Sequence, residues 1–186
     1  MTFYAFVLFI HIARAFFLFA GLVLEWTAFH FLSRSVDHGG VQQWVLTAAF
    51  STKVYGPAIG LILLSGGYLG GVLKAWNQAW LPASLLVLVA AGLVGVTLTA
   101  PRVRALKKLG LPLQGAITMD VRARIQDPVL IASSRIRVAL VLGVLLLMVS
   151  KVDLRVSVLI SISALAIGLI ASAPRWKQRV KLAASN

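Results

Sequence analysis

The feature that most constrains this chain is a series of apolar stretches, each long enough to cross a bilayer as a helix. A helical span needs about 20 mostly apolar residues. Five stretches reach that length, over residues 3–32, 44–73, 81–100, 128–150 and 154–173. Backbone polar groups in lipid must be satisfied within the chain, so such stretches form helices. We therefore predict a single all-α domain, a polytopic transmembrane bundle of about five helices.

The composition agrees with a membrane protein and excludes other classes. Of 186 residues, 60% are hydrophobic and 12% are charged, whereas a soluble domain is about half apolar and a quarter charged. This excludes a soluble enzyme, a disordered chain and an ordinary nucleic-acid-binding domain, so we expect no nucleic-acid partner. The absence of cysteine excludes disulfides and thiol catalysis. We expect a multi-pass protein of the cell membrane, of the kind found in bacterial inner membranes.

The placement of basic residues predicts the orientation. The net charge is +13, and basic residues gather in the connection 101–127 and the tail 174–186. Five spans place these two stretches on the same side, which the positive-inside rule assigns to the cytoplasm. The N-terminus is then outside. At the cytoplasmic face, the basic side chains predict contacts with anionic lipid headgroups.

Two segments leave alternatives open. In the connection 101–127, apolar and basic residues alternate, which is compatible with a short interfacial helix or with a solvated basic loop. The second span carries three small-xxx-small pairs, a pattern of close helix packing. These glycines could pack inside the bundle, line a hinge, or contact a second copy or another membrane subunit. The pairs are Gly56 with Gly60, Gly66 with Gly70, and Gly67 with Gly71.

Ionisable residues inside the spans are the candidate functional residues, because each costs about 2.5–3.5 kcal/mol at a helix centre unless it has a partner or faces a cavity. They are His11, Arg14, Glu25 and Lys53. Glu25 lies about seven residues from the inner end of its span and Lys53 about nine, in consecutive antiparallel helices. Their matching depth predicts a buried charge pair. Arg135 and Arg137 are expected to extend toward the headgroups.

His11 and Arg14 are three residues apart and share a helix face. One interpretation is a single-histidine site for haem b, with Arg14 near a propionate. The other is a hydrogen-bonded structural histidine. The segment FVLFIHIARAFFLFAGLVLEWTAFHFLSR resembles the opening helix of CopD-like membrane proteins and of the HemJ-type membrane protoporphyrinogen oxidase. In that oxidase family an early histidine binds haem, and the resemblance therefore points to His11.

Two features depart from that oxidase type, which uses basic residues in a later helix and has about four spans. Here residues 81–100 carry no charge, and there are five spans. No paired carboxylates, catalytic triad, phosphate-binding loop or metal-ligand spacing appears, so we expect neither a metal site nor an enzyme. We favour an accessory, assembly or scaffold subunit without catalytic chemistry. The alternative is a haem-binding redox protein, or a small-solute or proton transporter, that uses His11, Arg14, Glu25 and Lys53.

Overall fold

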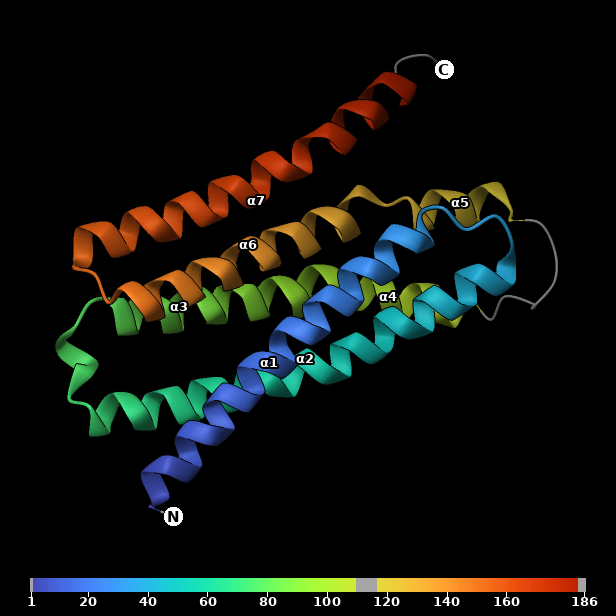
Figure 1. The fold of residues 1–186 in the computed structure, drawn as a ribbon. Coiled ribbons are helices and arrows are strands. Elements are labelled where there is room, and N and C mark those ends of the chain that lie inside the picture. The colour runs from blue at the N-terminus through green and yellow to red at the C-terminus, as the bar shows by residue number, and fades with distance from the viewer. Residues whose placement is uncertain (1, 110–116, 184–186) are drawn as a thin grey trace.

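The protein is an all-α polytopic membrane bundle, seen in a computed structural model that describes residues 2–109 and 117–183, with side chains as far as Ala173 (Figure 1). The described helices are α1 (Phe3–Leu32), α2 (His38–Val72), α3 (Trp80–Val94), α4 (Ala100–Lys108), α5 (Met119–Ile125), α6 (Pro128–Ser150) and α7 (Leu154–Ala183). A short 3₁₀ helix, η1 (Ala75–Asn77), precedes α3, and a π-helical turn, η2 (Gly95–Thr99), joins α3 to α4. Five helical segments are long and apolar enough to cross a membrane.

The helices α1 and α6 have the bounds predicted from the apolar runs, but α2 begins earlier than residue 44. Asp37 caps its N-terminus, because its carboxylate accepts a hydrogen bond from the Gly40 backbone N–H at 2.6 Å. An N-cap aspartate satisfies one of the four free N–H groups at a helix start. The first turn of α2 therefore forms over His38–Gly40, before the predicted start of this span at residue 44.

The third span does not end at Ala100 as predicted. Helix continues through Pro101 to Lys108, and the π-helical turn η2 lies immediately before that proline. Proline removes one backbone hydrogen bond and its ring clashes with the carbonyl four residues earlier. A wider π turn is one of the usual ways in which a long helix accommodates such a disruption.

The described parts of the connection 101–127, residues 101–109 and 117–127, form two short helices rather than a solvated loop. Val103 and Leu106 of α4 and Val121 and Ile125 of α5 are buried in one apolar cluster with residues of α1 and α2. The interfacial-helix alternative is therefore closer to the structure, although these side chains pack on the bundle instead of entering lipid. Leu111 and Leu113, which belonged to the same pattern, lie outside the described residues.

The last helix also extends further than predicted, because Pro174 does not close it. α7 runs from Leu154 to Ala183. A proline inside a long helix removes one backbone hydrogen bond. The helix can still continue if the backbone groups that lose this bond find other partners. α7 packs mainly along α6, on the side of the bundle away from α2 (Figure 1).

The three glycine pairs of α2 have different surroundings. A Cβ atom at Gly66 would lie 3.3 Å from His11, and one at Gly70 would meet Leu81, so this pair packs within the bundle. Gly67 and Gly71 lie under the Trp76 ring. At Gly56 and Gly60, in contrast, a Cβ atom would meet no described residue within 4 Å. Only this last pair is free to receive another helix.

The orientation remains a prediction. The end of α1, α4, α5 and the start of α6 lie together at one end, opposite the turns that follow α2 and α6 (Figure 1). We expect cysteine placed at Gln78 to react with an impermeant maleimide on intact cells. Cysteine placed at Ala184 should react only after permeabilisation, since the basic end is assigned to the cytoplasm. The natural chain has no cysteine, so any labelling of the protein comes from the introduced residue. Labelling of the Ala184 position in intact cells would reverse the assignment.

Candidate functional site

A fully buried ion pair joins the first helix to α6. The Glu25 carboxylate accepts a hydrogen bond from Nη2 of Arg137, and the two side chains are 0% and 1% exposed. These residues are 112 positions apart in sequence. Two charges removed from both water and headgroups are stable only when they compensate each other. The pair therefore fixes the position of α1 against α6.

Hydroxyl groups extend this pair toward the π-helical turn. Nη2 of Arg137 also donates to Oγ1 of Thr99 at 3.2 Å, and Thr99 shares a 2.8 Å hydrogen bond with Ser133. The wide turn η2 ends at Thr99, so its geometry sets where this hydroxyl lies. π turns inside longer helices occur frequently at functional sites. We call Glu25, Tyr55, Thr99, Ser133 and Arg137 the polar centre.

The guanidinium of Arg137 is also held by an aromatic ring and a glycine. Its Cζ atom lies 4.9 Å from the centroid of the Tyr55 ring, within the range of a cation–π contact. A Cβ atom at Gly95 would lie 3.3 Å from Nη1 of Arg137 and 3.4 Å from the Tyr55 hydroxyl. Only a residue without a side chain leaves this space to both groups. Gly95 is thus part of the reason that a large cation fits here.

Three atoms of the polar centre have no hydrogen-bond partner among the described residues. They are Oε2 of Glu25, the hydroxyl of Tyr55 and Nη1 of Arg137, all of them buried. Together they offer an acceptor, a group that can donate or accept, and a charged donor. A buried polar atom without a partner is costly and calls for a physical explanation. The polar centre could therefore hold a small polar molecule.

The predicted pairing of Glu25 with Lys53 is wrong. Glu25 pairs with Arg137, and the Lys53 side chain is exposed. Lys53 lies on the other side of α2, since Ser51 and Tyr55 are the residues that face inward. Successive helical residues turn by about 100°, which directs Lys53 away from both. Arg137 likewise does not extend to the headgroups.

His11 and Arg14 lie apart from the polar centre. Nδ1 of His11 is 2.9 Å from the Ser65 hydroxyl, which joins α1 to α2. Arg14 lies over the ring of Phe17 on its own helix, with Cζ 5.7 Å from the ring centroid. Neither described cavity is lined by His11. Haem ligation by His11 stays a prediction to which this arrangement adds no support.

Buried apolar residues of α1 separate His11 from Glu25. Leu18 and Leu22 lie between them and belong to the main core cluster. The fourteen residues from His11 to Glu25 correspond to about 21 Å along a helix. The four predicted site residues are therefore not brought together into one site by the described structure.

Sequence reasoning missed Arg137, Thr99 and Ser133. Ser133 and Arg137 are four residues apart and share one face of α6, which is a signal that could have placed Arg137 inside the bundle. Thr99 carries no comparable signal, because its position depends on the π turn. No family model, curated protein or solved structure matches this chain. The site is therefore interpreted from its own geometry.

Proposed function

We propose that this protein is an accessory or assembly subunit of a membrane complex, without catalytic chemistry, that binds another membrane protein through one face of α2. The observation that carries the proposal is the outward position of Lys53, Gly56 and Gly60. They are spaced three and four residues apart and so share a helix face. Small residues at this spacing allow two helix backbones to approach closely in lipid.

Lys53 supports a partner of defined chemistry. It forms no ion pair or hydrogen bond with any described residue, and it lies in the middle of the long helix α2. A charge at such a position favours an acidic side chain or a free carbonyl on a neighbouring helix. A two-fold interface between identical chains would place Lys53 near its own copy. Repulsion between the two lysines disfavours that arrangement, and we therefore assign the face to a different chain with an acidic residue.

The proposal is tested by photo-crosslinking in native membranes. With a photoreactive residue at Leu64, an exposed position four residues after Gly60 on the same helix face, we expect one discrete adduct with a different membrane protein. The same residue at Leu86, an exposed position on α3, should give no discrete adduct. Lys53→Glu should reduce the Leu64 adduct about tenfold, as expected for a change of about 1.4 kcal/mol. Exchange of the partner's acidic residue for lysine should restore it.

Two outcomes would overturn this assignment. One is an adduct between two copies of this chain. The other is a heteromeric adduct that forms equally well with Lys53→Glu, because contact without charge dependence contradicts the stated partner chemistry. Identification of a cross-linked protein alone therefore does not establish the partner. The assignment depends on the loss of the adduct with Lys53→Glu and its recovery after the charge exchange.

A second function is favoured by the unpartnered atoms of the polar centre. Oε2 of Glu25 and Nη1 of Arg137 could bind a small polar solute or take part in proton transfer. The paired variant Glu25→Gln with Arg137→Met separates this role from a structural one, since it removes both charges and strands neither. A stable paired variant that loses proton or solute flux in liposomes would support transport. Unchanged flux would leave the pair with a structural role only.

A further inference from the structure

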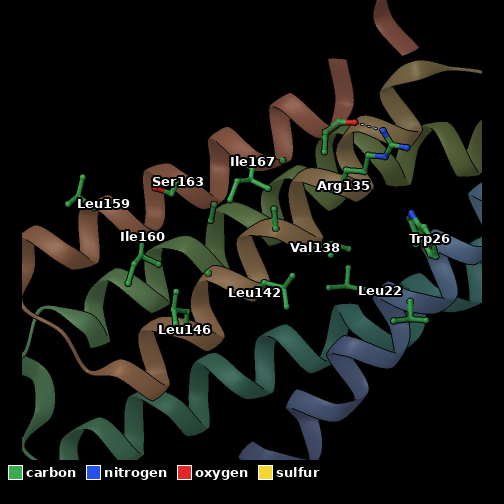
Figure 2. A pocket seen from close by; sticks show the side chains of 16 residues that line it. Leu22, Trp26, Arg135, Val138, Leu142, Leu146, Leu159, Ile160, Ser163 and Ile167 are labelled. Carbon is green, nitrogen blue, oxygen red and sulfur yellow. Dashed lines mark hydrogen bonds between the residues drawn. The ribbon is translucent and has the colours of Figure 1, made fainter. Parts of the chain in front are cut away.

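An apolar groove opens between α1, α6 and α7, away from the α2 face (Figure 2). Its volume is about 840 Å³, and among the described residues that line it only Arg135 is charged. α6 forms one wall with Val138, Leu142 and Leu146, and α7 forms the other with Ile160 and Ile167. Arg135 and Trp26 lie together at one end of the groove (Figure 2). The groove is therefore apolar along its length and basic at one end.

The length of the groove indicates what fills it. Along α6 it extends from Leu146 to Arg135, eleven residues or about 16 Å of helix. This is about half of the 30 Å hydrocarbon core. A partner helix that crosses the membrane would need a groove of the full thickness. A single acyl chain from one leaflet matches the observed length.

A smaller polar cavity continues the groove at its basic end. Trp26 and Arg135 border both cavities, and the smaller one, of about 40 Å³, also contacts His30 and Ser134. At about 10–15 Å³ for one water-sized group, it has room for roughly three oxygen atoms. Ser134 is 1% exposed, and its hydroxyl has no hydrogen-bond partner in the part of the chain that the structure describes.

The groups around the small cavity favour an anion. Nη1 of Arg135 donates to the Ala171 carbonyl, and the guanidinium has further N–H donors. The Ser134 hydroxyl, the His30 ring and the Trp26 indole N–H can also donate. The described residues that line the two cavities include no acidic side chain. An oxyanion with several acceptor oxygens therefore fits this end, because guanidinium and hydroxyl donors are common phosphate ligands.

We propose that the groove is a specific site for one anionic phospholipid. One acyl chain lies between α6 and α7, and the phosphate binds Arg135, Ser134 and His30. The lipid belongs to the leaflet at the basic end of the bundle. The site is independent of the α2 face, so either assignment can fail without the other.

Lipid titration followed by native mass spectrometry tests the site. We expect the purified protein to bind one phosphatidylglycerol about tenfold more tightly than phosphatidylcholine with the same chains, because both lipids offer a phosphate but the Arg135 guanidinium repels the choline cation. Arg135→Gln should remove this preference. Lys53→Gln removes a positive charge elsewhere and should leave it unchanged. Ser163→Trp should prevent binding of both lipids, because the ring fills the groove.

Fluorescence gives a readout that does not depend on those variants. Phosphatidylglycerol with brominated acyl chains should quench a saturable part of the tryptophan emission, and Trp26→Phe should abolish that part. Inorganic phosphate at millimolar concentration should not reverse the quenching, which distinguishes a lipid from a free anion. Three results would overturn the site: quenching that only follows bulk lipid content, reversal by inorganic phosphate, or an equal loss of preference in Lys53→Gln.

Discussion

Replacement of Glu25 by glutamine is expected to lower the free energy of unfolding by about 3–5 kcal/mol. The substitution leaves Arg137 as an uncompensated cation that is 1% exposed. Its remaining contacts to Thr99 and Tyr55 are neutral and cannot replace a carboxylate. Reversible unfolding in mixed detergent micelles would measure the change.

The matched variants identify the partner of Glu25. Adding Arg137→Met to Glu25→Gln should recover most of the lost stability, because a buried ion pair can often be replaced by apolar groups at little cost. Lys53→Met alone should change the stability by less than about 1 kcal/mol, since the side chain is exposed. If Lys53→Met rescued Glu25→Gln and Arg137→Met did not, the assigned pairing would be incorrect.

Replacement of Gly21 by leucine is expected to destabilise the bundle by about 3 kcal/mol, the upper part of the usual range for overpacking. A Cβ atom at this position would lie 2.9 Å from Cβ and 3.1 Å from the backbone nitrogen of Tyr55. Backbone atoms cannot move aside as a flexible side chain can. The variant must separate α1 from α2 and draw Tyr55 away from Arg137.

Gly60→Leu is the control for this experiment, since a Cβ atom there would meet nothing within 4 Å. It should preserve the stability of the isolated protein, and leucine has a higher helix propensity than glycine. The same variant should weaken the proposed contact of α2 with a partner. Equal destabilisation by Gly21→Leu and Gly60→Leu would contradict the packing of α1 on α2.

The spans could be predicted because burial in lipid depends on the length and polarity of a segment. The uncharged run 81–100 identifies a membrane helix without knowledge of its neighbours. The ends of helices depend on local bonds, which are harder to foresee. Asp37 starts α2 early, and helix continues past both Pro101 and Pro174 because tertiary context can overcome the usual effect of proline.

The polar centre was only partly predictable. Glu25 could be recognised as a residue that needs a cation, and counting along the helices gives similar depths for Lys53 and Arg137. Depth in the membrane alone therefore allows either Lys53 or Arg137 as the partner of Glu25. The rotation of each helix about its own axis selects between them, and this rotation depends on close contacts such as those of Gly21 with Tyr55. Weak apolar periodicity within a span gives little information about it.

The sequence distance between Glu25 and Arg137 has a consequence for biogenesis. The two residues are separated by 112 positions, and a ribosome adds about 5–20 residues per second. Glu25 is therefore made roughly 6–22 s before its counter-ion. During that time the first two helices already exist as a hairpin, in which Tyr55 packs against Gly21 one turn away from Glu25. The arrival of the fourth span, which carries Arg137, is the step that neutralises Glu25 and completes the polar centre.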